Sequence, residues 1–285
     1  MKTAGLTMME KIFLNDNLGV LQFPEWMTNC NISHFITTRS GGVSEGNFAS
    51  MNPGLYTTDL PENIVENRRI LCDALRIDPC QLITPHQVHS DRIVVIDRTW
   101  LEQNESDRKL SLEGVDALMT NVPDVFVTVS TADCVPVLLY ASDKQAVAAV
   151  HAGWRGTVAA IVQKTIRKMV AVYGCDVSFL QVAIGPSISQ QSFEVGAELV
   201  DVFRASALWA PGDVETLFWL NPATRKYHID LWRANRLLSY YEGVQEPHIF
   251  QSDLCTYEHA DELFSARRLG INSGRILSGI SIHRS

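Results

Sequence analysis

Two apolar runs between positions 128 and 157 each carry, at or near one end, a side chain that can bind a metal. The segment "TVSTADCVPVLLY" carries Cys134, and "AVAAVHAGWRGT" carries His151. A third candidate, His89, lies upstream in "HQVHS". One thiolate and two imidazoles form a ligand set that zinc accepts readily, and three protein ligands leave the fourth tetrahedral position open for water or substrate. The residue types therefore predict a catalytic metal centre rather than a structural one.

The same residues allow other interpretations. Cys134 could act as a nucleophile with His151 as its base, which would make the protein a cysteine hydrolase or amidase. A lone cysteine in an apolar run is also commonly an inert core thiol. A third possibility is a non-catalytic nucleotide-binding or scaffold protein, in which replacing either residue would leave the biological effect intact.

A carboxylate accompanies the cysteine. Asp133 directly precedes Cys134 within an otherwise apolar stretch, and a carboxylate in such a stretch costs several kcal/mol to bury unless it is paired or linked to a metal. We therefore interpret Asp133 as a candidate catalytic residue that orients a ligand or shuttles a proton.

Two glycine-containing segments could bind an anion. In "VHAGWRGT" the pattern predicts a helix starting just after Gly156, and the unpaired N–H groups of a helix start beside Arg155 would suit a phosphate or carboxylate. In "HFITTRSGGVSEGNFASMNPG" a glycine-rich loop follows Arg39 and includes Asn52, so this loop could hold an oxyanion or a sugar. Its glycine spacing is not that of a P-loop or a dinucleotide fingerprint.

Three further residues are candidates for substrate contact. Gln87 lies between the histidines of "HQVHS" and offers a polar side chain. Near the C-terminus, Phe264 could stack on a heterocycle while Arg267 binds its anionic partner. Core packing for the phenylalanine and a solvated position for the arginine are the alternatives.

Composition limits the possible partners. The chain has 285 residues, of which 46% are hydrophobic and 20% charged, and its formal net charge is −8. Lysines and arginines are scattered, so no basic stripe exists for a nucleic acid polymer.

We find neither a secretory signal pattern nor an apolar run long enough for a membrane span, which predicts a cytoplasmic protein. Six widely spaced cysteines without a Cys-x-x-Cys pair argue against a disulfide framework. A monomer and a small homo-oligomer both remain open.

Strand and helix patterns mix without strict alternation. This predicts an α+β fold in which mixed β-sheet layers are flanked by helices, with residues 1–285 in a single large domain and residues 1–28 as an N-terminal extension or edge strands. Strands are predicted at 32–38, 92–96, 115–119, 125–130, 135–140, 146–150, 179–184 and 275–282. Helices are predicted at 61–75, 157–173, 195–207 and 230–241, with Asp59 capping the first. The polar segment 102–113 is predicted to be a loop.

Six motifs together resemble a known family. They are "HFITTRSGGVS", "HQVHS", "TADCVPVLL", "AAVHAGWRGT", "IGPSIS" and "LFSARR". Their order is that of the bacterial family labelled laccase-domain or polyphenol oxidase, whose members are mostly described as purine nucleoside phosphorylases with additional deaminase activity. The resemblance covers about residues 32–282. It implies His89, Cys134 and His151 as the metal and catalytic set, and it shows one departure, Ala266, where the family usually has a tyrosine.

The resemblance implies a specific chemistry. Phosphate would attack C1′ of adenosine, inosine, guanosine or methylthioadenosine and give ribose 1-phosphate and the free base, while a water activated by zinc would deaminate adenosine. Editing of a peptidoglycan precursor amide is the alternative for relatives that use the cysteine as a nucleophile. Copper polyphenol oxidase chemistry fits less well, because eight histidines without a His-x-His pair cannot build a multicopper relay. Copper could still load a single His₂Cys site in vitro.

Overall fold

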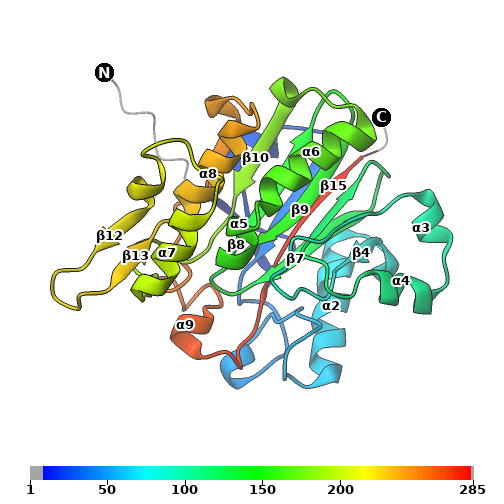
Figure 1. Cartoon of the computed structure of the whole chain (residues 1–285). Coiled ribbons are helices and arrows are strands. Elements are labelled where there is room, and N and C mark those ends of the chain that lie inside the picture. The colour runs from blue at the N-terminus through cyan, green and yellow to red at the C-terminus, as the bar shows by residue number, and fades with distance from the viewer. Residues whose placement is uncertain (1–8, 284–285) are drawn as a thin grey trace.

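Two six-stranded mixed sheets form the centre of the protein in the computed structural model, which describes residues 9–283 (Figure 1). The first has the order β1 (Glu10–Phe13), β2 (Gly19–Gln22), β3 (Ile32–Thr37), β15 (Ile276–Ile282), β7 (Phe126–Thr131), β4 (Leu82–Ile83). The second has the order β14 (Ile249–Gln251), β10 (Leu180–Ile184), β8 (Val135–Ala141), β9 (Ala146–Ala152), β6 (Ala117–Thr120), β5 (Ile93–Val95). Pairs β4–β7, β5–β6 and β10–β14 are parallel and the other pairs are antiparallel. The predicted α+β class with mixed sheets is confirmed.

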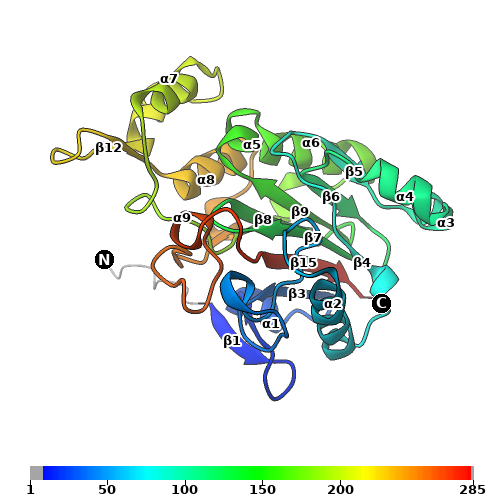
Figure 2. The same ribbon diagram turned by 90° about the horizontal axis from the view of Figure 1, so that it is seen from below.

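The two sheets are stacked, and helices cover their outer faces (Figure 2). Helix α2 (Pro61–Leu75) lies on the first sheet, whereas α5 (Trp154–Val158), α6 (Ile161–Tyr173) and α8 (Leu231–Tyr241) lie on the second. The remaining α-helices are α1 (Pro24–Met27), α3 (Arg98–Glu102), α4 (Glu105–Ser111), α7 (Ala197–Ala205) and α9 (Ala266–Leu269). Short 3₁₀ turns cover 46–48, 79–81, 177–179, 214–217 and 246–248. None of the helices within residues 9–283 is long and apolar enough to cross a bilayer.

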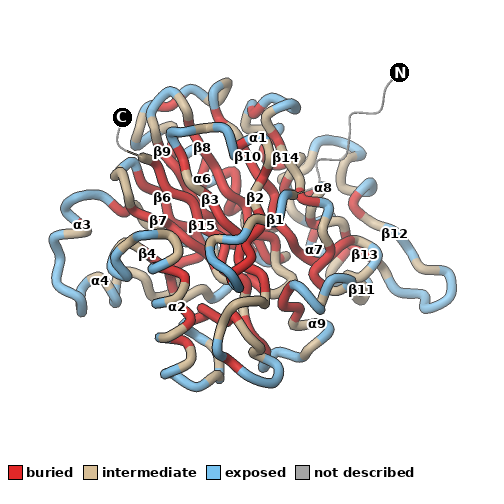
Figure 3. The backbone as a smooth tube through the Cα atoms, turned by 180° about the vertical axis from the view of Figure 1, so that it is seen from behind, coloured by how far each residue is buried: buried red, intermediate tan, exposed pale blue. Residues whose placement is uncertain are grey.

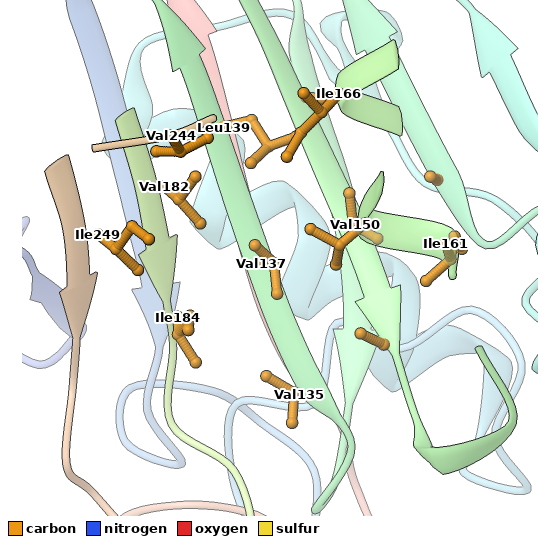
Figure 4. Close-up of a cluster of buried hydrophobic side chains, with 14 of the residues drawn as sticks. Val135, Val137, Leu139, Val150, Ile161, Ile166, Val182, Ile184, Val244 and Ile249 are labelled. Carbon is orange, nitrogen blue, oxygen red and sulfur yellow. The ribbon is translucent and has the colours of Figure 1, made fainter. Parts of the chain in front are cut away.

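Side-chain alternation along the strands divides the core into three apolar layers. On β8, Val137 and Leu139 face the helices, whereas Leu138 and Tyr140 face the first sheet. Figure 4 shows the helix-facing set together with Ile166. Such alternation follows from the two-residue period of a strand, and each fully buried aliphatic side chain stabilises the fold by about 1.5–3 kcal/mol. Seen from behind, the central strands are buried along most of their length (Figure 3).

A third, three-stranded sheet consists of β11 (Glu194–Val195), β13 (Tyr227–Ile229) and β12 (Phe218–Leu220). The hairpin formed by β12 and β13 projects from the body of the molecule (Figures 1 and 2).

Four sequence predictions differ from the structure. The helix predicted at 157–173 is two helices, α5 and α6, because Ala160 adopts a left-handed conformation with φ of 60° between them. The predicted loop at 102–113 contains α4, which begins at the N-cap Asn104. Helix α2 has the predicted bounds, but Leu60 rather than Asp59 is its N-cap. Near the N-terminus only β1 is an edge strand, since β2 pairs on both sides; residues 1–8 lie outside the described part.

Candidate metal centre

The three predicted ligands converge in space. One ligand atom from each of His89, Cys134 and His151 can be chosen so that all three lie within 4.8 Å of one another. The Sγ atom of Cys134 lies 3.7 Å from Nε2 of His89. Tetrahedral zinc with ordinary Zn–S and Zn–N bonds would separate a sulfur and a nitrogen ligand by about 3.6 Å. The donor set and its spacing therefore fit a zinc ion with three protein ligands.

Strand pairing brings the cysteine and the second histidine together. Strands β8 and β9 are antiparallel partners in which Pro136 lies opposite His151 and Val135 opposite Ala152. Cys134, directly before β8, therefore lies beside Gly153, directly after β9. A methyl group at Gly153 would lie 2.9 Å from the Cys134 sulfur, so only glycine leaves room for the thiolate in this arrangement.

A buried carboxylate orients the second histidine. Nδ1 of His151 lies 2.7 Å from Oδ1 of Asp116, and the exposed fractions of these two side chains are 4% and 0%. The Asp116 carboxylate accepts a hydrogen bond from Nδ1–H of His151, which leaves Nε2 of the ring as the ligand atom. Metal-binding histidines characteristically carry such a carboxylate partner, which fixes the tautomer and raises the basicity of the ligand.

The same carboxylate holds the loop of the first histidine. The backbone N–H groups of Val88, His89 and Ser90 donate hydrogen bonds of 3.2, 3.0 and 2.6 Å to the two oxygens of Asp116. His89 adopts a left-handed conformation with φ of 64°, which is costly for a residue with a Cβ and is retained where the surroundings impose it. One aspartate thus positions both imidazole ligands.

The charges of the site are strongly coupled. Burial alone would raise the pKa of Asp116, but the hydrogen bond and charge of His151 outweigh it and lower this pKa to about 2. Burial would likewise raise the pKa of the Cys134 thiol, but the neighbouring His151 lowers it below the ordinary value, and the thiolate in turn raises the pKa of His151. A thiolate is the form that binds metals and attacks electrophiles.

The three ligands lie on the wall of a cavity of about 170 Å³. The side chain of His151 lies on the face of β9 that is directed toward the first sheet, and the side chain of Thr131 lies on the face of β7 that is directed toward the second sheet. The cavity therefore lies at one end of the layer between the two sheets. Strand β7 also contributes Ser130 and helix α9 contributes Ala266, and the other lining residues come from loops: Gly54, Tyr56, Pro85, Gln87, Ala132, Ile271 and Arg275. Ala266, the departure from the family pattern, is thus one of the lining residues.

Asp133 makes contacts other than those expected. Its carboxylate accepts hydrogen bonds from the hydroxyl of Thr256 at 2.7 Å and from the backbone N–H of Arg267 at 2.6 Å. The carboxylate that bonds to a candidate ligand is that of Asp116. Asp133 has φ of 84°, and its carboxylate links the turn that carries Cys134 to the segment of Thr256 and to helix α9, which contains Arg267.

The expected anion site after Gly156 does not exist in the predicted form. The helix start lies at Trp154 rather than after Gly156, and α5 has only five residues. Arg155 is exposed, stacks on the Trp154 ring at 4.2 Å, and is absent from the cavity wall. The prediction of one helix over 157–173 missed both this start and the break at Ala160.

Arg39 and Phe264 contact each other rather than the cavity. The Arg39 guanidinium lies 4.9 Å from the ring centre of Phe264 and donates to the carbonyl groups of Ala49 and Ala260. Phe264 is fully buried within the core between the sheets. Arg39 therefore links the two loops that contain these carbonyl groups. For Phe264 the structure shows core packing, which was the alternative to stacking on a substrate.

The other three candidates have distinct positions. Gln87 lines the cavity, but its amide makes two hydrogen bonds to the backbone of Ser130, at 2.8 and 2.7 Å. Asn52 is fully buried behind the cavity wall. Arg267 is exposed, lies over Phe193 at 5.6 Å and donates to the carbonyl of Glu194, away from the cavity.

Two residues of the site were missing from the sequence prediction. Asp116 stands in "GVDALMT", a lone acid at the start of an apolar strand, so the reasoning that selected Asp133 applied to it equally. Arg275 directly precedes β15 and carries no local signal, because an arginine beside a strand is ordinarily solvated.

Comparison with known proteins defines the class. The chain matches the family model described as multi-copper polyphenol oxidoreductase laccase over residues 33–283. It is 45% identical over 273 residues to a purine nucleoside phosphorylase of Bacteroides thetaiotaomicron, covering 96% of this chain and 100% of the relative. It is 39% identical over 249 residues to adenosine deaminase RL5 of an unknown prokaryotic organism, covering 87% and 93%.

A solved structure has a closely similar fold. YlmD from Geobacillus stearothermophilus superposes with a TM-score of 0.84 at 30% identity, covering 93% of this chain and 96% of that one. The protein therefore belongs to the laccase-like polyphenol oxidoreductase family. The family description mentions several coppers, but within residues 9–283 only one group of three metal-binding side chains is found, and it holds one thiol and two imidazoles.

Proposed function

We propose that this protein is a purine nucleoside phosphorylase that also deaminates adenosine at the same site. The observation that carries the proposal is the convergence of His89, Cys134 and His151 on the wall of one small cavity, held by Asp116. Relatives that cover nearly the whole chain bear the names of these two activities, which supports it.

In phosphorolysis an oxygen of phosphate bonds to C1′ of the ribose as the bond from C1′ to the purine nitrogen breaks. The purine leaves with the bonding electrons and takes up a proton, and ribose 1-phosphate remains. In deamination the oxygen of water bonds to C6 of adenosine and ammonia leaves. We propose purine nucleosides and phosphate as the substrates of a cytoplasmic enzyme.

We propose zinc as the resident metal, since a tetrahedral N₂S site with a carboxylate behind one histidine is typical of it. Bound zinc would supply a Lewis acid that favours deprotonation of a water nucleophile at neutral pH. The protein's own contribution is positional. Asp116 fixes the His151 ring and the loop of His89, and Gly153 leaves room for the Cys134 thiolate. Copper loading in vitro would not establish the physiological metal, because copper binds such sites more tightly by intrinsic affinity.

Product analysis tests the activity. Zinc-loaded protein is incubated with adenosine, with and without phosphate, and the bases and sugars are separated by chromatography. Adenine or hypoxanthine that appears only with phosphate supports phosphorolysis, and inosine without phosphate supports deamination. A Cys134→Ser variant should lose both activities, whereas Cys30→Ser, a change at an exposed free cysteine, should keep them. No turnover by folded, zinc-loaded protein would contradict the proposal.

A cysteine hydrolase is the second candidate, and one observation favours it. Cys134 has a lowered pKa beside His151, which is itself hydrogen-bonded to Asp116, an order of groups that suits a cysteine nucleophile. A third group, His89, also faces the sulfur, and a nucleophile does not need it. Iodoacetamide separates the two functions. A nucleophile reacts rapidly and works after chelation, whereas a zinc thiolate is protected and loses activity with the metal.

A further inference from the structure

Arg275 contributes the only guanidinium to the wall of the metal cavity in the described part of the chain. The residue directly precedes β15, and its Nη1 donates to the carbonyls of Ser273 and Gly274 at 2.7 and 3.0 Å. Its Nη2 donates to the carbonyl of Ile271 at 3.2 Å. These bonds fix the plane of the group, so its direction relative to the cavity is set before any ligand arrives.

A buried asparagine holds the backbone of Arg275. Oδ1 of Asn52 accepts the N–H of Arg275 at 3.0 Å and that of Gly54 at 3.2 Å. The amide nitrogen of Asn52 donates in turn to Asp59 at 2.9 Å. A methyl group at Gly54 would lie 2.9 Å from Cβ of Arg275, so the two wall segments are closely packed. Rigid support of this kind lowers the entropy lost when a charged side chain binds a ligand.

The guanidinium retains unused donors. Arginine carries five N–H groups, and three of them bond to the carbonyls already named. Within residues 9–283, no hydrogen bond is found for Nε or for the second N–H of Nη2 of Arg275. None of the cavity-lining residues is acidic, and the carboxylate of the nearby Asp133 is occupied by Thr256 and Arg267. The cavity thus holds a cation without a carboxylate partner on its wall.

A second polar group points to a ligand at the same end of the cavity. Thr131 lines the cavity and is 1% exposed, and its hydroxyl has no hydrogen-bond partner in the described chain. The β7–β15 register places Thr131 opposite Ile276, the neighbour of Arg275. A buried hydroxyl without a partner costs free energy, and a bound oxyanion would supply the missing acceptor.

We propose that Arg275 binds the inorganic phosphate that attacks the nucleoside, with its free N–H groups donating to two phosphate oxygens. This proposal rests on the proposed phosphorolysis and names the anion site within the same cavity. A planar guanidinium suits two oxygens of one phosphate, whereas an exposed lysine would offer only a point charge. Because deamination uses water instead of phosphate, Arg275 serves one of the two reactions and not the other.

The experiment compares the two activities in Arg275→Gln and Arg275→Lys. Loss of two charge-assisted hydrogen bonds should raise the KM for phosphate by about 10- to 100-fold in Arg275→Gln. The kcat/KM for adenosine deamination should fall by a much smaller factor than the one by which the KM for phosphate rises, since deamination does not involve the anion. The zinc content should stay at the wild-type level, because Arg275 is not among the candidate ligands. Arg275→Lys keeps the charge and should have an intermediate KM, and it replaces Arg275→Gln if that variant does not fold.

Direct binding provides a readout independent of turnover. Titration of inorganic phosphate into the zinc-loaded protein by calorimetry should give a dissociation constant that rises in Arg275→Gln by the same factor as the KM. Arg155→Gln is the comparison, because the sequence pointed to Arg155 for this role and the structure places it outside the cavity. Unchanged phosphate binding in Arg275→Gln, or a loss confined to Arg155→Gln, overturns the proposal. If no variant and no wild type shows phosphorolysis, the proposed function fails, and the calorimetry still decides whether Arg275 binds phosphate.

Discussion

Oδ1 of Asp116 lies 2.7 Å from Nδ1 of His151 and 3.0 Å from the backbone nitrogen of His89. A single buried oxygen therefore holds both the His151 ring and the backbone of His89, the two histidines of the candidate metal centre. Its position depends on β6, whereas the histidines belong to β9 and to the loop before β5. The geometry of the centre is consequently a property of three chain segments that no local pattern links.

Replacing this carboxylate should weaken metal binding. In Asp116→Asn the NH₂ group of the amide would replace one of the oxygens that now accept hydrogen bonds, so donor would face donor. The ligands would then be held less well, and the zinc affinity should fall by about 10- to 100-fold. Competition with a chromophoric chelator measures the affinity. Asp91→Asn is the matched control, because Asp91 is exposed and pairs with Lys164. Equal zinc affinities for Asp116→Asn and the wild type would show that Asp116 does not position the ligands.

A methyl group should suffice to disturb the ligand set. At Gly153 it would lie 2.9 Å from Sγ of Cys134 and 3.1 Å from Cδ2 of His89, so Gly153→Ala should separate these ligands and lower the zinc affinity on the order of ten-fold. The backbone φ of −63° allows alanine, so the fold should persist by circular dichroism. Gly156→Ala, whose nearest neighbours lie 3.3 Å away and are not ligand atoms, should bind zinc normally. Normal zinc affinity in Gly153→Ala as well would contradict this steric explanation.

Two threonines of β7 should respond oppositely to valine. The Thr131 hydroxyl is buried without a partner within the described residues, so Thr131→Val should raise the free energy of unfolding of the ligand-free protein by about 1 kcal/mol. The Thr128 hydroxyl donates to the carbonyl of Ile83 and contacts the hydroxyl of Thr84, at 2.8 and 2.7 Å, so Thr128→Val should lower it by about 1–3 kcal/mol. Urea denaturation measures both. A destabilised Thr131→Val would indicate a partner for that hydroxyl.

His34 should make the fold sensitive to acid. Burial lowers its pKa from 6.5 to about 4, and its Nε2 accepts the N–H of Phe23 at 2.7 Å, which requires the neutral ring. The unfolded chain therefore binds this proton more readily. The contribution of neutral His34 to stability is fully present above pH 6.5 and is lost as the pH falls toward 4, by about 3 kcal/mol at most.

The comparison for His34 is His34→Gln, whose amide oxygen can still accept the Phe23 N–H without titrating. The loss of unfolding free energy between pH 6.5 and 4 should be smaller in this variant. Denaturation curves across that range measure the difference. Identical acid profiles for the variant and the wild type would assign the acid sensitivity to other groups.

Much of the fold followed from local patterns. Apolar runs such as 135–140 and 146–150 predicted strands because burial on both faces requires continuous apolar side chains, and β8 and β9 extend these runs by one and two residues. The predicted bounds of α2 agree with the structure. The break at Ala160 and helix α4 were missed, because a single left-handed residue or a short polar helix changes the hydrophobic periodicity little.

The sequence by itself determined the donor types. A thiol and two imidazoles in specific motifs predicted a His₂Cys centre, and the structure brings these three within 4.8 Å. Tertiary structure alone decided which polar residues surround them. Asp116, rather than Asp133, bonds to His151, and Arg275, rather than Arg155, lines the cavity. The physical reason is that donor chemistry belongs to each residue, whereas hydrogen-bond partners are set by contacts between strands and loops far apart in the chain.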